Sequence, residues 1–217
     1  IAISGGKEDR AAIYAHDIGL SVTKNAQGEV GFRVLVGGGL GRTPIIGVEI
    51  CEFVPWQHIL TYVESILRIY NQYGRRDNKY KARIKILVKA LGIDEFKRQV
   101  EADWADLKEG PGTLTIEEVN RVASFFTDPA YETLTDHDSA LNEFKADSRS
   151  FSNWMMRNVK PHRVPGYAIV VLSLKKPGDA PGDATAEQME AIADLADRYS
   201  FGELRITHKQ NLVLADV

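Results

Sequence analysis

The division of this chain is decided by residues 160–174, which read KPHRVPG over 160–166 and YAIVVLSL over 167–174. The first part is rich in proline, glycine and charge, a composition typical of a linker. The second part is a nearly continuous apolar run, which predicts a β-strand. Because the pattern changes here, we expect one domain over residues 1–160 and a second over 161–217.

The second domain is predicted to contain one helix and two further strands after this first strand. Residues 175–184 form a loop rich in proline, glycine and aspartate, and Thr185 with Gln188 has the spacing of a capping box that begins a helix. Residues 204–207 and 211–214 have the pattern of strands. The order β-α-β-β is about half of a ferredoxin-like domain. Such a half exposes an apolar sheet face, so we expect this face to bind a partner, another copy of the chain being one candidate.

The first domain is predicted to be a mixed sheet followed by helices, which makes the fold class α+β. Strands are expected at 1–4, 18–23 and 30–36, with a hairpin turn at 25–28. Apolar residues recur at three- and four-residue spacing between Pro55 and Tyr73, which predicts a helix that stops at Gly74. Further helices are expected in the following places: just before Gly92, from Asp94 to about Leu107, from Thr115 to Phe126, and around 141–144.

Composition excludes several classes of protein. The chain has 217 residues, is 44% hydrophobic and 26% charged, and carries a net charge of −3, so any basic site must be local. No apolar run approaches the about 18 residues of a membrane span, and no signal peptide is evident. The single cysteine, Cys51, excludes an internal disulfide and a four-thiolate metal site, and we expect it to be buried in a cytoplasmic, reducing setting. The five histidines show no metal-ligand spacing, so no metal-binding residue is predicted.

The two ends of the chain are unusual for a whole protein. It begins with Ile1, without Met and within a predicted strand, and residues 212–217 at the other end are also strand-like. Domains usually begin and end in polar, frayed segments. We therefore expect the chain to be a piece of a longer protein, whose remainder would be its first partner.

Residues 75–89 form the most basic stretch, with seven cations against the single carboxylate of Asp77. If residues 81–85 are extended, Lys81, Arg83 and Lys85 project from one side of the chain, because strand side chains alternate. With the helix N-terminus that follows, they would form a pocket for a small anion or for carboxylates. The alternative is a solvated basic face.

Two further segments could contact a ligand. Residues 37–42, GGGLGR, allow close approach of the backbone and present bare amides, although a tight bend at a sheet edge is an equal alternative. Residues 205–211, RITHKQN, offer cationic and amide donors at a strand end, or form a simple hairpin turn. His16 and Asp17 are adjacent and would face opposite ways on a strand, which favours a structural histidine over a catalytic dyad.

Taken together, these segments resemble the haemoprotein of the sulfite/nitrite reductase family. The resemblance to the first half of the sirohaem domain lies in SGG at 4–6, DRAA at 9–12, HDIG at 16–19 and VLVGGGLGRTP at 34–44. The segment NKYKARIK at 78–85, followed by LG at 91–92, is similar to the family's basic anion-binding segment. GELRITHKQN at 202–211 is similar to the second ferredoxin-like half. The resemblance covers residues 1 to about 104 and 165–217.

The resemblance implies an enzyme in which sirohaem is coupled to a [4Fe-4S] cluster and which reduces sulfite to sulfide, or nitrite to ammonia, by six electrons. The electrons would come from ferredoxin or a flavoprotein. Arg83 and Lys85 fall on the positions of the basic pair that clamps the anion over the haem and supplies protons. By the same resemblance, the positions expected to contact the cofactor are Gly37, Gly38, Gly39, Arg42, Lys81, Gln210 and Asn211.

The resemblance also implies that part of the enzyme lies outside this chain. Cys51 is alone and outside any cluster motif, and the family's first ferredoxin-like half would precede Ile1. We therefore expect this chain by itself to be colourless and inactive. The rival reading is a non-catalytic anion- or partner-binding structural module. A nucleic-acid-binding module is disfavoured by the negative net charge and by the lack of interleaved aromatics beyond Tyr73 and Tyr80.

Overall fold

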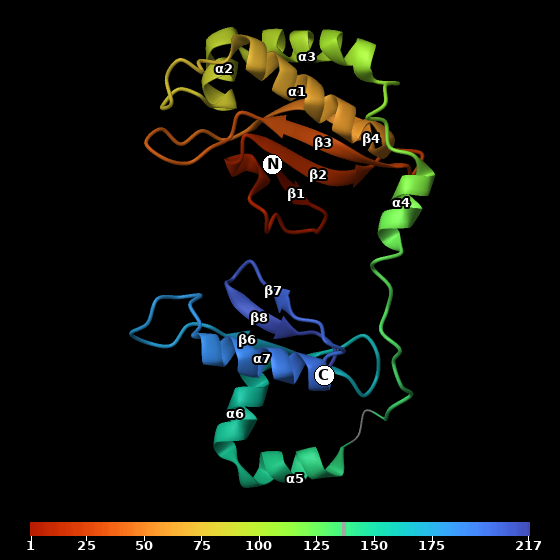
Figure 1. The fold of residues 1–217 in the computed structure, drawn as a ribbon, viewed down its shortest axis with the longest axis vertical. Coiled ribbons are helices and arrows are strands. Elements are labelled where there is room, and N and C mark those ends of the chain that lie inside the picture. Colours follow the sequence, from red (N-terminus) through yellow and green to blue (C-terminus); the bar gives the residue numbers. More distant parts are fainter. Residues whose placement is uncertain (136–137) are drawn as a thin grey trace. The chain divides into compact units, whose positions relative to one another are not determined.

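Alternating apolar residues in the first 55 positions build a four-stranded mixed sheet. In the computed structural model, which describes residues 1–135 and 138–217, the strands lie in the order β1-β2-β3-β4 (Figure 1). β1 is parallel to β2, and the other neighbours are antiparallel. Their bounds are β1 (Ala2–Ser4), β2 (Ile18–Lys24), β3 (Val30–Val36) and β4 (Val48–Pro55). The predicted mixed sheet is confirmed, with β4 as a strand whose bounds the sequence had not indicated.

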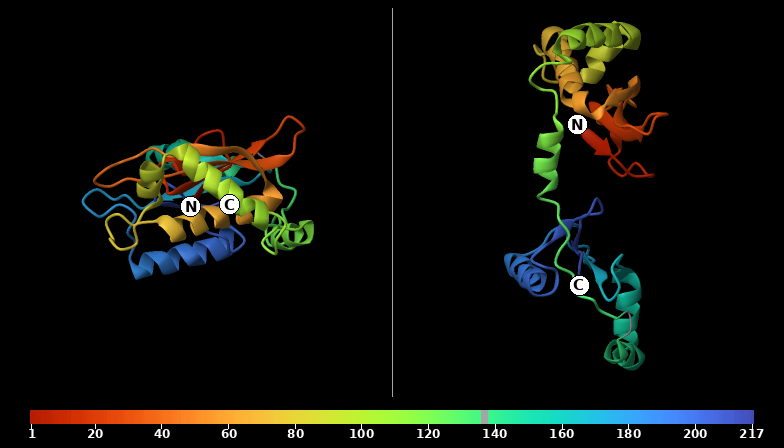
Figure 2. Two further views of the ribbon diagram at one scale, coloured as in Figure 1. Left: turned by 90° about the horizontal axis from the view of Figure 1, so that it is seen from above. Right: turned by 90° about the vertical axis from the view of Figure 1, so that its right-hand side faces the viewer.

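Helices cover one face of this sheet, as both views of Figure 2 show. A short 3₁₀ turn, η2 (Trp56–His58), leads into α1 (Ile59–Tyr73), and α2 (Ile84–Leu91) and α3 (Ile93–Leu107) follow. The apolar face of α1, which the three- and four-residue spacing predicted, packs against the sheet. This packing is favourable because it removes the apolar side chains from water. Core side chains at most 1% exposed include Ile18, Val34, Val36, Ile50, Val54, Tyr62, Ile66, Phe96 and Val100.

Cys51, expected to be buried, lies within β4, where it is partly buried and packs against the core. The pairing of β3 with β4 is irregular where Val34 faces Cys51, which marks a β-bulge. The thiol donates to the Phe53 carbonyl over 3.5 Å. Burial raises the pKa of this thiol, so the protonated form is favoured.

The second sheet has the order β5-β6-β8-β7 and is antiparallel throughout. The predicted β-α-β-β order is confirmed by β6 (Ala168–Ser173), α7 (Ala186–Tyr199), β7 (Arg205–Ile206) and β8 (Asn211–Leu214). The capping box of Thr185 and Gln188 at the start of α7 is formed on both sides. Three elements precede this motif: α5 (Ser139–Asp147), α6 (Arg149–Asn158) and β5 (Val159–Pro161).

The chain forms two compact units, residues 1–126 and 127–217. α4 (Ile116–Ala123), capped by Thr115 as predicted, ends the first unit. The boundary between the units, after residue 126, therefore comes earlier in the chain than the predicted domain boundary at 160–161. Because β5 pairs with β6 and α6 contacts both strands, these elements belong to the second unit. The stretch 160–166 is not a free linker: the ring of His162 is buried, with Nε2 3.2 Å from Oδ1 of Asp216. The division of the chain into domains at 1–160 and 161–217 stays a prediction.

None of the helices in the described parts of the chain is long and apolar enough to cross a membrane.

Candidate functional site

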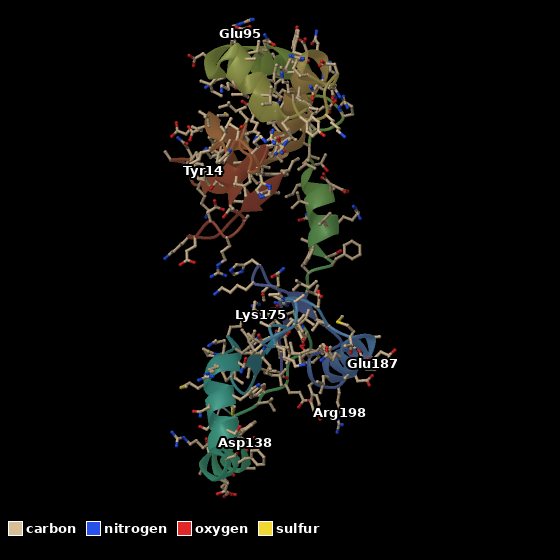
Figure 3. All side chains as sticks on the ribbon, turned by 90° about the vertical axis from the view of Figure 1, so that its left-hand side faces the viewer. Tyr14, Glu95, Asp138, Lys175, Glu187 and Arg198 are labelled. Atoms are coloured by element: carbon tan, nitrogen blue, oxygen red, sulfur yellow. The ribbon has the colours of Figure 1, made fainter. Side chains whose placement is uncertain are left out.

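The glycine segment that follows β3 is buried between two neighbouring stretches of backbone. Gly37 has a positive φ of 77°, and its N–H donates to the Asp17 carbonyl over 2.9 Å. Gly39 exchanges two 2.9 Å hydrogen bonds with Ile45, which closes a loop over residues 39–45. A Cβ at Gly38 would lie 2.3 Å from the Tyr14 carbonyl oxygen, so only glycine fits there. Tyr14, which Figure 3 labels, lies in the 3₁₀ turn η1 (Ile13–Ala15) between β1 and β2.

Two of the predicted basic residues meet this segment at Gly39. A Cβ built at Gly39 would lie 2.9 Å from Nη2 of Arg83 and 3.2 Å from Cδ of Lys85. The structure thus brings Gly39, Arg83 and Lys85 together, while the tasks assigned to them stay predictions. The backbone route differs from the prediction, however. Residues 81–85 are not a strand, because α2 begins at Ile84 and buries its apolar side chains at helical spacing.

Lys81 does not share this site in the structure. It is exposed, and its charge acts on Asp77. The hydrogen bond from Arg75, with a smaller contribution from Lys81, lowers the pKa of Asp77. Because α2 begins at Ile84, the extended conformation on which the alignment of Lys81 with Arg83 and Lys85 depended is not formed, and the assignment of Lys81 to the cofactor stays a prediction.

Arg83 is held by a carboxylate that sequence reasoning set aside. Its Nε lies 2.8 Å from Oδ1 of Asp17, and its Nη2 lies 2.8 Å from Oδ2, which makes a bidentate pair. This hydrogen bonding raises the pKa of Arg83. Two of the three guanidinium nitrogens are engaged by Asp17. The two residues are 66 positions apart, so no local spacing could have indicated the pair.

Lys85 is a buried cation, only 8% exposed. Its Nζ donates to the carbonyls of Thr43 over 2.8 Å and Leu40 over 3.4 Å. Among residues 1–135 and 138–217, none of the ion pairs involves Lys85. A buried charge without a counter-ion is costly, and an anion bound at Gly39 would relieve that cost.

The remaining predicted contacts are spread over both units. Arg42 is exposed on the loop that Lys85 holds. Gln210 and Asn211 belong to the second unit, in the turn between β7 and β8, where Gln210 has a positive φ of 55°. Oδ1 of Asn211 accepts a hydrogen bond from Lys175, which Figure 3 labels. This turn is also held by two backbone N–H groups that donate to Oγ1 of Thr207, the arrangement of the hairpin alternative.

His16 is exposed, and its backbone rather than its ring lies against Gly38. In the part of the chain that the structure describes, no group of three or more histidine, cysteine or acidic side chains could hold a metal ion. The predicted absence of a metal-binding residue stays a prediction.

The fold and this geometry define an α+β protein in which Arg83 and the buried Lys85 lie beside Gly39. Two family models match the chain: "Nitrite and sulphite reductase 4Fe-4S domain" over residues 1–107, and "Nitrite/Sulfite reductase ferredoxin-like half domain" over residues 161–217. The chain belongs to the sirohaem-dependent nitrite and sulfite reductase family.

Individual relatives agree with this assignment. An assimilatory ferredoxin-dependent nitrite reductase of Haloferax mediterranei is 30% identical over 100% of this chain and 33% of its own length. A sulfite reductase [NADPH] hemoprotein beta-component of Staphylococcus haemolyticus is 39% identical over 41% of this chain and 16% of its own length. The Mycobacterium tuberculosis NirA structure has the same fold, with a TM-score of 0.57, 22% identity, and coverage of 95% of this chain and 31% of that chain. At most about a third of the curated relatives' length is therefore represented here.

The site suits one of the family's two cofactors better than the other. A polycarboxylate tetrapyrrole such as sirohaem needs cations and apolar contacts. Arg42 offers an exposed cation and the side chains of Leu40 and Ile46 offer exposed apolar surface, whereas the N–H groups of Gly37 and Gly39 already donate to the carbonyls of Asp17 and Ile45. A [4Fe-4S] cluster needs cysteine thiolates, and this chain has only the protonated, partly buried thiol of Cys51. The residues present fit sirohaem and do not fit the cluster.

Proposed function

We propose that this chain supplies part of the anion-binding site of a sulfite or nitrite reductase, which reduces its substrate by six electrons to sulfide or ammonia. The observation that carries this proposal is the convergence of Arg83 and Lys85 on Gly39. It is supported by membership of the family and by the names of the relatives.

In this proposal the two cations have different tasks. Lys85 provides a desolvated positive charge, and its ammonium can also give up a proton. Arg83 stays protonated and presents a fork of donors. Both would hold the anion and stabilise the negative charge that develops as its bonds to oxygen break. Sirohaem, when bound, supplies the redox-active iron.

The same proposal assigns contacts with the cofactor. The contacts assigned to Gly37, Gly38 and Gly39 rest on the resemblance to the family, and the exposed loop residues Leu40 and Arg42 closely follow these buried glycines. The polar side chains that would pair with the carboxylates of the macrocycle are Arg42, Lys81, Gln210 and Asn211.

We also propose that the enzyme receives electrons from a ferredoxin or a flavoprotein, and the ferredoxin-dependent nitrite reductase among its relatives supports the first of these donors. A cytoplasmic setting and self-association through the sheet of the second unit remain proposals. Ile206 on β7, 82% exposed, is the apolar residue most available for such a contact.

The second candidate function is a non-catalytic anion- or partner-binding structural module. It is favoured by one observation: two of the hydrogen bonds of Lys85 go to carbonyls of the 39–45 loop, as in a purely structural lysine.

Single substitutions in the enzyme that carries this chain distinguish the two functions. We expect Arg83→Gln and Lys85→Gln each to leave haem content intact and to lower turnover by about 10²-fold, the scale of losing one electrostatic donor. Lys89→Gln, on the exposed side of α2, is the matched control and should leave turnover unchanged. If turnover of both site variants stays within about twofold of wild type, the anion-site assignment must be withdrawn.

A further inference from the structure

We infer that Asp17 is a positioning residue of the anion site, which fixes the Arg83 guanidinium in one orientation beside Gly39. The inference rests on the proposed function of Arg83 and Lys85. Nothing in the sequence motifs or in the relatives' names assigns a task to this carboxylate.

The backbone of Asp17 is fixed by the sheet. The residue directly precedes β2, whose first residue, Ile18, pairs with Val36 at the end of β3. Its carbonyl accepts the Gly37 N–H over 2.9 Å. Asp17 therefore joins the glycine segment through its main chain and Arg83 through its side chain.

The side chain of Asp17 removes the rotational freedom of the guanidinium. Nε of Arg83 lies 2.8 and 3.1 Å from the two carboxylate oxygens, and Nη2 lies 2.8 Å from Oδ2. Since the guanidinium is planar, a bidentate contact on this edge also fixes the direction of Nη1. The Nη1 edge is left to donate to a ligand, and Nη2 lies next to Gly39.

Burial and charge favour orientation over stability as the task of this pair. The side chains of Arg83 and Asp17 are 41% and 36% exposed, and ion pairs at such exposure contribute little to the free energy of unfolding. The carboxylate also cancels one of the two positive charges, so that Lys85 supplies the net charge of the site. Asp17 thus weakens the general attraction for anions while it aligns the donors. This combination suits turnover rather than tight binding.

The decisive variant is Asp17→Asn in the haem-loaded enzyme. It keeps the shape of the side chain and leaves Arg83 charged but unaligned, so we expect kcat to fall by about tenfold or more while KM for the anion does not rise. Titration of the haem's optical spectrum with the anion should give a Kd equal to or lower than that of wild type. Arg83→Gln, in contrast, should raise both KM and this Kd.

The matched control is Asp103→Asn. Asp103 receives Nε of Arg68 over 3.1 Å in the same unit, on helices α1 and α3, so its loss should change neither kcat nor Kd. A second variant, Arg83→Lys, keeps Asp17 and the charge but lacks the planar fork. Arg83→Lys should show the same fall in kcat without a rise in KM. This variant replaces Asp17→Asn as the test if Asp17→Asn does not fold.

A direct readout comes from the 217-residue chain itself. The Nε–H of Arg83 should give a slowly exchanging NMR signal in wild type that is lost in Asp17→Asn and kept in Asp103→Asn. A kcat within twofold of wild type in Asp17→Asn, or in Arg83→Lys, overturns the positioning task. If instead Arg83→Gln and Lys85→Gln both keep turnover within twofold, the proposed function itself fails.

Discussion

Gly38 and Gly39 both occupy positions where a Cβ would clash, but the atoms that it would meet differ. The position of a Cβ at Gly38 is blocked by backbone, since the carbonyl oxygens of Tyr14 and His16 would lie 2.3 and 2.6 Å away. The same position at Gly39 is blocked by the far ends of Arg83 and Lys85. Tightly packed backbone cannot easily move aside, whereas the ends of long side chains can. One glycine therefore serves the fold, and the other serves the site.

Alanine at each position should separate these two tasks. We expect Gly38→Ala to lower the free energy of unfolding by about 2 kcal/mol or more, as overpacking does. Gly39→Ala should change it by less than about 1 kcal/mol, while the protected Nε–H signal of Arg83 is lost because the guanidinium must shift. Urea unfolding and NMR of the chain measure the two effects. Gly5→Ala, whose Cβ would meet only Val22 at 3.6 Å, is the control. Equal losses of stability at 38 and 39 would contradict this explanation.

At the scale of elements, strong periodicity and capping signals were sufficient for prediction. α1 repeats apolar residues over four turns, and Thr115 and Thr185 both cap helices where their spacing indicated. An extended conformation of residues 81–85 was considered because Ile84 and Ile86 alternate with cations as in a strand, although a short helix ending near Gly92 was also predicted. Only the further apolar residues Leu87, Val88 and Leu91 complete the helical stripe of α2. The element α6 and the short strand β5 had no comparable signal in the sequence.

The candidate site was predicted in part for a similar reason. Arg83, Lys85 and the glycines lie in distinctive local segments, so their residue types indicated an anion site. The carboxylate of Asp17 reaches Arg83 across 66 positions and through tertiary packing alone. The same holds for the pair that joins α1 to α3, in which Tyr62 donates to Glu101 over 2.7 Å. Such contacts cannot be read from one sequence.

This Tyr62–Glu101 contact makes the packing of α1 on α3 sensitive to high pH. Burial first, and then the hydrogen bond to Glu101, raise the pKa of Tyr62 above its usual value of 10.0. Above about pH 10 the unfolded chain releases this proton and the folded chain keeps it, so the free energy of unfolding must fall as pH rises. The stabilisation is complete below pH 10 and is lost above it. The slope can reach about 1.4 kcal/mol per pH unit.

Tyr62→Phe tests this prediction. The variant should lose about 1 kcal/mol at pH 7 with the hydrogen bond, and its stability should fall less steeply than that of wild type between pH 10 and 11. Urea unfolding followed by tryptophan fluorescence measures both slopes. Because burial also raises the pKa of Cys51, Cys51→Ser is needed as a parallel control. Identical pH slopes in wild type and Tyr62→Phe would rule out this role for the tyrosine.

At the scale of the whole molecule, the number of cysteine thiolates limits which cofactor the chain can bind by itself. A [4Fe-4S] cluster is held by four cysteine thiolates in most proteins, and this sequence contains one cysteine. That cysteine lies at a bulge in β4, and its raised pKa disfavours the thiolate that would bind iron. The chain also represents only 16% to 35% of the length of its curated relatives.

We therefore expect the 217-residue chain, expressed by itself, to be purified without a cluster and without stoichiometric sirohaem. Partial burial of a large macrocycle forgoes most of the apolar contact that holds a cofactor, and the cations near Gly39 cannot replace that contact in water. The measurement is the optical spectrum together with iron and acid-labile sulfide per chain. Anaerobic purification from cells supplied with excess iron removes oxygen damage as an explanation for low iron, and Cys51→Ser should give the same spectrum as wild type. A Soret band with one iron per chain would show that these residues alone complete a haem site. About one to two irons per chain, with matching acid-labile sulfide and both lost in Cys51→Ser, would show that two to four chains share a cluster through this cysteine.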